Sequence, residues 1–353
     1  MRHVKNLFFF WLILTPFVVW RGYEGEKVIW FLSGGFGLCL FWLWRLVFLK
    51  IKIQFTKADY FFLVWLFVLL LSSWLGVHPL DSILGGSYRH QGVLFFFAFW
   101  LITKTLTLLS NPEKQFIRKC LAGAVLVEAG IVIIQVILGK VYFGRPLGTF
   151  GEENAVAGFL GVGFCFLNSG LLSFVIIATA VILTSSRIGL GMFVFLFLAK
   201  FLKLKKLALV LLAVVFLLYA ILDLAPAFKT FIGPKTLLWH FDQENRVLIW
   251  RMAVDKIRQR PLLGWGAESG ELVFDAAYRE AGMPLENMMV DRAHNLFLDV
   301  VLWSGLVGLV PFLVWLRLVF KKRPVEVAGW LGFACFQPLG VVHWLFLIWL
   351  TQL

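Results

Sequence analysis

Apolar runs recur along the whole chain, and many of them reach the roughly 20 residues that a helix needs to cross a hydrocarbon core of about 30 Å. Of the 353 residues, 61% are hydrophobic and only 15% are charged. Soluble domains carry roughly 45–50% apolar and about 25% charged residues. We therefore predict an all-α fold, a polytopic transmembrane bundle of 11 or 12 helices.

The chain is predicted to be a single membrane domain over residues 1–353, since its length leaves no room for a separate soluble domain. The first apolar run has no cleavage signal of small residues behind it and is interpreted as a retained span. The C-terminal stretch is interrupted at Gln337-Pro338, which leaves open one long kinked span or two short ones. The four cysteines lie in or beside apolar runs without a CxxC pair, so buried small side chains are favoured over disulfides or metal ligands.

Lysine-rich segments alternate along this topology and orient it. They lie at the N-terminus and at 50–57, 111–119, 200–206 and 321–323. The positive-inside rule assigns their side of the membrane to the cytoplasm. The net charge of +13 thus reflects topology, and no nucleic-acid partner is expected. The opposite side carries loops with Arg89, Arg145 and Arg187 and one long extracytoplasmic loop at 223–293.

The long loop contains a predicted amphipathic helix. It ends at Arg260-Pro261, because a residue before proline is pushed out of the α region. Its apolar face is formed by Arg246, Trp250, Ala253 and Ile257. An arginine on the same face as a tryptophan points into the protein or the membrane, where it needs an anionic partner. A new apolar helix starts at His294-Asn295, and we expect the functional site there.

The motifs that the sequence lacks narrow the chemistry. It contains no P-loop, no dinucleotide-binding glycine motif, no zinc-protease motif and no cluster with metal-ligand spacing. We therefore expect neither metal nor cofactor, so an enzyme of this kind must receive its energy within the substrate. Arginine binds pyrophosphate through paired hydrogen bonds of about 1.5–3 kcal/mol each, and a neutral histidine accepts a proton near neutral pH. The outward-facing arginines and His294 favour cleavage of a phosphate-linked substrate at the outer face of the membrane.

Five motifs carry a resemblance to a known family. They are GSYRHQG (86–92), RPLGTFGEENAVAGFL (145–160), SSRIGLGMF (185–193), NRVLIWRMAVDKIRQRPLLGWG (245–266) and HNLFLDVVLWSGLVGL (294–309). With them the chain resembles the superfamily of O-antigen ligases and polymerases, enzymes of bacterial envelope polysaccharides. The resemblance implies a glycan donor on undecaprenyl pyrophosphate and an acceptor that is a glycan or lipid A–core. It also implies a place in the bacterial cytoplasmic (inner) membrane, with the active site on the periplasmic face.

The resemblance implies catalysis or pyrophosphate binding by Arg187, Arg246 and His294. Further candidates for substrate binding are Arg89, Arg145, Trp250, Asn295 and Asp299. Most of these residues also have a structural interpretation. Arg187 can extend to lipid headgroups, His294 can cap its helix, and Arg145 can anchor a turn. Trp250 is a packing residue or a sugar platform, and Asp299 orients the site or bonds within the bundle.

The predicted reaction is a glycosyl transfer in which an acceptor hydroxyl attacks the anomeric carbon of the lipid-linked glycan. Arg187 and Arg246 stabilise the departing pyrophosphate, and His294 deprotonates or orients the acceptor. Ligation to lipid A–core is the first interpretation, and polymerisation of repeat units is the second. A transporter of lipids or small solutes is the alternative of another class, since ionisable residues within apolar runs, such as Lys104 and Glu128, also mark transport paths. Most charged candidates, however, lie at the outer ends of the predicted spans, and no internal repeat is visible.

Overall fold

The computed structural model describes residues 8, 10–19, 24–50, 54–86, 89–142, 144–167, 170–200, 246–280 and 290–352. This part of the chain is helical and contains no strand; Tyr142 and Arg145 form an isolated antiparallel bridge. The prediction of an all-α fold is confirmed. The elements are η1 (Thr15–Phe17), α2 (Glu24–Val47), α3 (Lys57–Trp74), α4 (Pro79–Leu84), α5 (Val93–Thr107), α6 (Asn111–Ile137), α7 (Glu153–Gly163), η2 (Phe164–Phe166), α8 (Leu171–Leu183), α9 (Arg187–Lys200), α12 (Arg246–Gln259), α13 (Gly270–Glu280), α14 (Leu296–Phe320), α15 (Pro324–Ala334) and α16 (Val341–Gln352).

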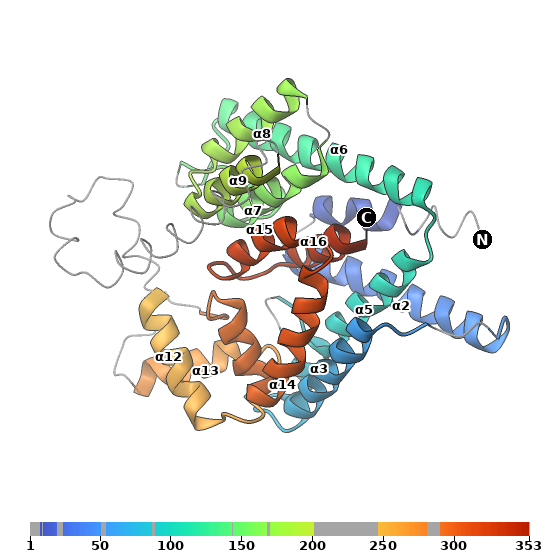
Figure 1. Ribbon diagram of the computed structural model, residues 1–353. Helices are drawn as coiled ribbons and strands as arrows, with labels where there is room; N and C mark the ends of the chain where they lie inside the picture. Colours follow the sequence, from blue (N-terminus) through green and yellow to red (C-terminus); the bar gives the residue numbers. More distant parts are fainter. Residues whose placement is uncertain are drawn as a thin grey trace.

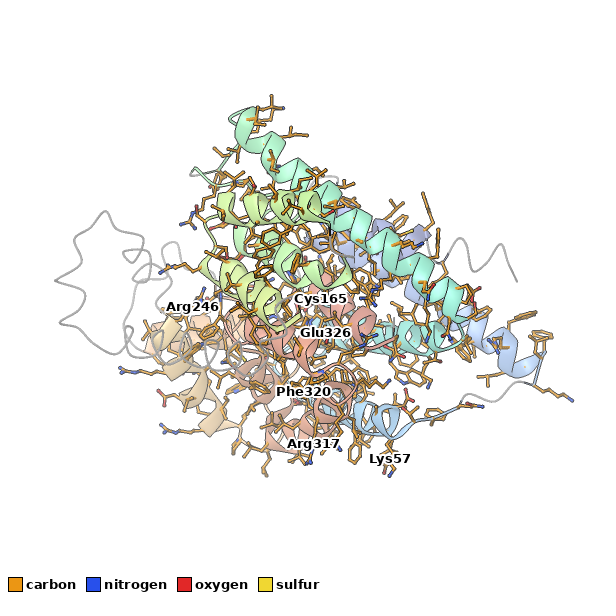
Figure 2. All side chains as sticks on the ribbon, turned by 45° about the horizontal axis from the view of Figure 1, so that its top comes forward. Lys57, Cys165, Arg246, Arg317, Phe320 and Glu326 are labelled. Carbon is orange, nitrogen blue, oxygen red and sulfur yellow. The ribbon has the colours of Figure 1, made fainter. Side chains whose placement is uncertain are left out.

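Among the described residues, α2, α3, α6 and α14 are long and apolar enough to cross a membrane, and α5, α7, α8, α9 and α16 are shorter apolar helices. Large apolar side chains are exposed on the long helices, for example Phe36 on α2 and Ile137 on α6. Side chains project outward from these helices around the molecule (Figure 2). Exposed apolar surface of this extent is typical of a lipid-facing bundle. The chain is a multi-pass membrane protein, although a predicted span near 207–222 and parts of the long loop lie outside the described residues.

One feature of the predicted topology is wrong, and one alternative that the sequence left open is resolved. The segment 111–119 is not a loop, because α6 already begins at Asn111. Ser110 and Glu113 form a capping box there, in which the Ser110 backbone N–H donates to Glu113 Oε2 at 2.7 Å. The basic residues of this segment thus extend the helix by about two turns. The C-terminal stretch consists of two short helices, α15 and α16, which settles the alternative left open by Gln337-Pro338.

Aromatic packing between α3 and α14 forms one part of the core. The Trp65 ring lies 5.1 Å from Phe312, and the Phe62 ring lies 5.0 Å from Trp315. The Trp65 indole N–H also donates to Ser304 Oγ at 3.2 Å. Helix α16, buried from residue 341 to residue 350, contacts α2, α5 and α7, while α15 contacts α9 and α14. The two C-terminal helices therefore lie between the α6–α9 group and the α3–α14 pair (Figure 1).

Helix α14 is broken at Gly305, whose φ of 62° and ψ of −171° are not helical. The turn at 261–266 fills the break with backbone hydrogen bonds. Leu306 N–H donates to Pro261 O at 2.8 Å, and Trp265 N–H donates to Leu302 O at 2.6 Å. A Cβ atom on Gly305 would lie 2.0 Å from Leu262 O. Only a glycine leaves room for the turn of the long loop at this position. The loop is thereby fixed to the helix that follows it.

Candidate functional site

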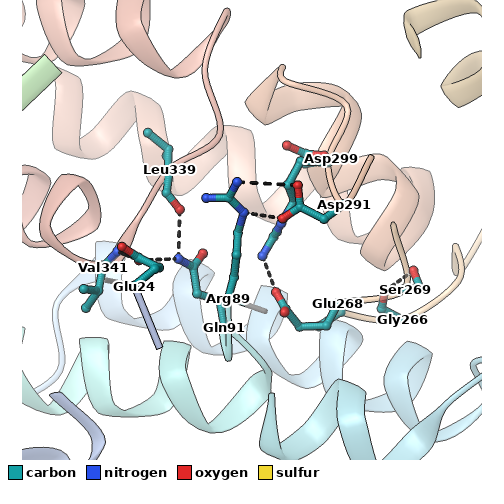
Figure 3. Close-up of polar contacts among 12 residues, drawn as sticks. Glu24, Arg89, Gln91, Gly266, Glu268, Ser269, Asp291, Asp299, Leu339 and Val341 are labelled. Atoms are coloured by element: carbon teal, nitrogen blue, oxygen red, sulfur yellow. Dashed lines mark hydrogen bonds and ion pairs between the residues drawn. The ribbon is translucent and has the colours of Figure 1, made fainter. Parts of the chain in front are cut away.

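Four connecting segments contact one another near the start of α14. They include residues 85–86 and 89–92, 264–269, 290–295 and 335–341. Arg89 and Asp291 join the first of these segments to 290–295 (Figure 3). Asn295 and Cys335 join 290–295 to 335–341. Three of these segments contain residues of the motifs described above. Motifs that are far apart in the sequence therefore contribute to one polar cluster.

A buried ion pair between Arg89 and Asp291 lies at the centre of this cluster (Figure 3). Arg89 is only 8% exposed, and its Nε and Nη2 atoms donate to the two carboxylate oxygens of Asp291. Burial opposes the charge of Arg89, but Asp291 and the more distant Glu152 and Glu24 raise the pKa of its guanidinium. Burial also opposes ionisation of Asp291, but Arg89 first, then Arg292 and His294, holds its pKa below the ordinary value. Both groups are thus charged near neutral pH.

Gln91 fastens the Arg89 segment to the start of α16. Its side-chain amide donates to Leu339 O at 2.8 Å and lies 3.4 Å from Glu24 Oε1. The same Glu24 oxygen accepts from Val341 N–H at 2.5 Å (Figure 3). Arg89 is therefore held from both sides, by Asp291 and through its neighbour Gln91.

His294 directly precedes α14 and adopts a left-handed backbone conformation with a φ of 53°. The N-cap of the helix is Asn295, whose side-chain oxygen accepts from Phe297 N–H at 3.0 Å and from Leu298 N–H at 3.2 Å. The interpretation of His294 as a helix cap is thus wrong. Its Nδ1 atom is buried and has no hydrogen-bond partner among the described residues. Burial first, and then the charges of Arg246 and Arg89, lower the pKa of His294 to about 3 against the opposing charge of Asp291. The imidazole is therefore neutral at neutral pH.

The helix that carries Arg246 is α12, and it ends before Pro261, as predicted. Arg246 is 5% exposed and Ala253 is fully buried, whereas Arg251 is exposed on another face of the helix. The predicted inward orientation of Arg246 is confirmed, and its charge acts on His294. Trp250, one turn along, donates its indole N–H to Ala293 O at 2.9 Å. Trp250 thus packs against the backbone beside His294.

Asp299 and Arg292 complete the surroundings of His294. Asp299 Oδ1 accepts from Ala293 N–H at 2.7 Å, so Asp299 orients the segment that presents the histidine. Arg292 pairs with the buried Glu268 and lies over the Trp303 ring, with its guanidinium carbon 4.2 Å from the ring centre. The sequence pattern pointed to Asp299, but it did not single out Asp291, Arg292 or Glu268. For Asp291 and Arg292, the adjacent opposite charges in VDRAH were the one feature of the sequence that could have indicated a role.

Arg145 and Arg187 come from two other segments of the chain. Arg145 Nη1 is 2.9 Å from Glu153 Oε1, and its backbone bridges Tyr142. This geometry fits the anchoring of a turn. Arg187 is the first residue of α9, a helix that contacts α7 and α15, and its side chain is partly buried.

The 144–152 segment, which contains Arg145, is fixed from within the bundle. Thr149 N–H and Oγ1 contact the two Glu128 oxygens of α6 at 2.7 and 2.8 Å, and Lys27 Nζ of α2 donates to Thr149 O at 2.6 Å. Gly148 has a φ of 55°, and a Cβ atom there would lie 2.1 Å from Glu128 Oε1. Glu128 therefore has an internal structural partner. In the part of the chain that the structure describes, no group of three or more His, Cys, Asp and Glu residues has the geometry of a metal site.

The fold and this site define the class: a multi-pass, all-α membrane protein with an arginine–histidine centre where its long loop meets α14. Residues 172–313 match the O-antigen ligase family, which confirms the resemblance to the O-antigen ligase and polymerase superfamily. The match includes the motifs of Arg187, Arg246 and His294, whereas Arg89 and Arg145 lie before it. No curated protein has a sequence significantly similar to the chain.

Proposed function

We propose that this protein is a glycosyltransferase that moves a glycan from undecaprenyl pyrophosphate to a sugar hydroxyl, and that lipid A–core is the acceptor. The observation that carries the proposal is the placement of neutral His294 beside the buried Arg246. A second support is the O-antigen ligase match over the segment that contains both residues. A cation next to a neutral base suits a reaction with an anionic leaving group and an acceptor that loses a proton.

In the proposed reaction, the acceptor oxygen forms a bond to the anomeric carbon of the donor glycan. The bond from that carbon to the pyrophosphate oxygen breaks, and the pyrophosphate leaves with the electron pair. Arg246 stabilises the negative charge that grows on it, and Arg187 is proposed to assist. His294 takes the proton of the acceptor hydroxyl. A pyrophosphate beside Arg246 offsets the cationic field, and this raises the pKa of His294 towards the working pH.

Arg89 is proposed to act differently from the two family arginines. Its guanidinium already holds Asp291, so its first role is to fix the segment that carries His294. In the same way, Asn295 caps α14, and Asp299 holds the backbone of Ala293. These residues are proposed to position the site, while Trp250 supports it at Ala293 O.

One structural feature is compatible with the transporter alternative, and another argues against it. A broken helix such as α14 is common at transporter binding sites. The break at Gly305, however, is filled by the backbone of the 261–266 turn, and the residues next to it in α14 are Ser304 and Leu306. No ionisable side chain occupies those positions, and the charged cluster lies at the end of the helix. The geometry therefore favours the transferase.

The test is transfer of a labelled lipid-linked glycan by purified protein, with donor binding measured separately. Arg246→Lys keeps the charge but loses the planar fork, and we expect a rate lower by roughly 30- to 1000-fold. His294→Ala should slow turnover by about 10²- to 10⁴-fold with donor binding nearly intact. Arg251→Lys, on the exposed face of α12, is the matched control and should transfer normally.

The outcomes separate the assignments. Wild-type turnover by His294→Ala would exclude the base, and full activity of Arg246→Lys would exclude paired hydrogen bonding to pyrophosphate at that residue. With unlabelled lipid A–core and repeat-unit acceptors offered side by side, the product distinguishes ligation from polymerisation. Export of labelled lipid without any transfer would support the transporter.

A further inference from the structure

A small cavity lies at the opposite end of α14 from His294. It is formed by the start of α3 and the ends of α5, α14 and α16, and its volume is about 60 Å³. Its polar lining includes Thr56, Asp59, Trp100, Lys104, Lys322 and Thr351. Helix α14 is 25 residues long, so at 1.5 Å per residue the cavity is on the order of 37 Å from the site described above.

Inside the cavity, the Asp59 carboxylate already accepts hydrogen bonds from several neighbouring side chains. Its carboxylate accepts from Lys104 Nζ at 2.8 Å, from the Trp100 indole N–H at 3.1 Å and from Thr56 Oγ1 at 2.6 Å. Lys104 is only 4% exposed, and an ammonium group has three N–H donors. The bond to Asp59 is the one hydrogen bond that Lys104 Nζ makes among the described residues, so it uses one of the three. Lys104 can therefore serve an additional oxygen ligand within the cavity.

Two further lysines bring positive charge to the mouth of the cavity. Lys322 lines it from the turn after α14, and Lys114 lies close enough to act on Lys322 electrostatically. Lys322 is exposed, but local desolvation lowers the pKa of its ammonium group; Asp59 opposes this shift, and Lys114 and Lys104 add to it. Lys104 pairs with the carboxylate of Asp59, and Lys322 and Lys114 add two further positive charges nearby. The local field favours an anion.

The walls of the cavity are apolar and aromatic. Phe62, Phe99 and Trp315 line it, and Phe55 stacks on Trp100 with ring centres 5.9 Å apart. Phe55 is 60% exposed, so it offers apolar surface beside the charged mouth. One end of this site suits an anionic head, and the other suits a hydrocarbon chain.

We propose that the cavity binds the phosphate group of an anionic phospholipid. Its volume of about 60 Å³ is several times the ~10–15 Å³ that one water needs, which suits a group of phosphate size. Thr56 and Lys322 line the cavity, and both belong to segments that the positive-inside rule assigns to the cytoplasm. Anionic lipids of that leaflet are attracted to basic clusters at the ends of spans. The site is thus a lipid contact independent of the proposed transfer reaction.

The experiment measures lipid retention by the full-length protein in detergent, by native mass spectrometry. Phosphatidylglycerol, phosphatidylcholine and inorganic phosphate are added in separate arms. Wild-type protein should retain phosphatidylglycerol in preference to phosphatidylcholine. Lys322→Gln should lose roughly fivefold of this preference, the equivalent of about 1 kcal/mol per basic residue. Lys321→Gln is the matched control, since Lys321 precedes Lys322 in the same turn but does not line the cavity.

Lys104→Gln deprives the buried Asp59 of its partner and is expected to impair folding. Lys114→Gln therefore serves as the second test variant, and its preference for phosphatidylglycerol should fall about as much as that of Lys322→Gln. Equal retention of the two lipids by wild-type protein would overturn the proposal, and so would equal losses for Lys321→Gln and Lys322→Gln. Lys322-dependent binding of inorganic phosphate without retention of phosphatidylglycerol would overturn the proposal that the ligand is a lipid. The ligand would then be a free anion.

Discussion

Gly305→Ala tests whether the 261–266 turn and α14 form one unit. At a φ of 62° and a ψ of −171°, a non-glycine residue costs about 1–3 kcal/mol in backbone strain. The new Cβ atom would lie 2.0 Å from Leu262 O, so the turn has to move. Two backbone hydrogen bonds that follow the break, Leu306 N–H to Pro261 O at 2.8 Å and Val307 N–H to Leu262 O at 3.2 Å, would weaken. At about 0.5–1.5 kcal/mol each, the total loss is about 2–6 kcal/mol.

This loss is a large part of the roughly 5–15 kcal/mol that stabilises a typical protein. The assay is thermal unfolding of the purified protein in detergent, followed by the loss of the monodisperse chromatographic peak. Gly130→Ala is the matched control: it lies within α6, and a Cβ atom there meets nothing within 4 Å. That substitution should be neutral or stabilise the protein by about 0.5–1 kcal/mol. If Gly305→Ala unfolded at the wild-type temperature, the contact between the 261–266 turn and α14 would not stabilise the protein, and the two would not form one unit.

Asp291→Asn leaves Arg89 buried without its main partner and should cost about 3–5 kcal/mol of stability in thermal unfolding; Asp255→Asn, which removes an exposed pair with Arg258, should cost at most about 1 kcal/mol. Gly148→Ala, with its Cβ 2.1 Å from Glu128 Oε1, should lower the unfolding temperature, and a wild-type value would show that the 144–152 segment can relax. His294 has a pKa lowered to about 3 by burial and by Arg246, so the unfolded chain binds its proton first as the pH falls below the ordinary value of 6.5. The free energy of unfolding should therefore fall by roughly 2 kcal/mol between pH 6.5 and pH 5, and this fall should be absent in His294→Gln. Identical dependences of stability on pH in the two proteins would refute the lowered pKa of His294. Transfer activity should persist in a chelator, and loss that a divalent ion restores would reveal a metal site.

The sequence predicted those features that depend on local patterns. The stop at Pro261, the burial of Arg246 and the beginning of the next helix at His294-Asn295 all follow from backbone restrictions and helical periodicity within one segment. The resemblance to the O-antigen ligase superfamily was visible in the order of the motifs, and the family match supports its later part.

Contacts between distant segments could not be predicted in this way. The partner of Arg89 is 202 positions away in the sequence, and several acidic residues were equally plausible partners on charge alone. Helix α13 was missed within a run interpreted only as polar, although Val273, Phe274, Ala277 and Tyr278 are buried at helical spacing. The break at Gly305 was hidden because an apolar helix containing a glycine gives no sign of an incoming turn.

The contacts of Glu128 also have a consequence for membrane insertion. A carboxylate in the middle of α6 raises the free energy of placing that helix in lipid on its own, by about 2.5–3.5 kcal/mol for a charged group at the centre of a span. Its hydrogen-bond donors, Thr149 N–H and Oγ1, are synthesised after it, whereas Lys27 on α2 is synthesised before it. The helix therefore reaches its lowest free energy only after the segment that follows it has folded back. Assembly of this half of the bundle is thus coupled across three segments, and α6 should insert less efficiently in a chain truncated before Thr149 than in the full-length protein.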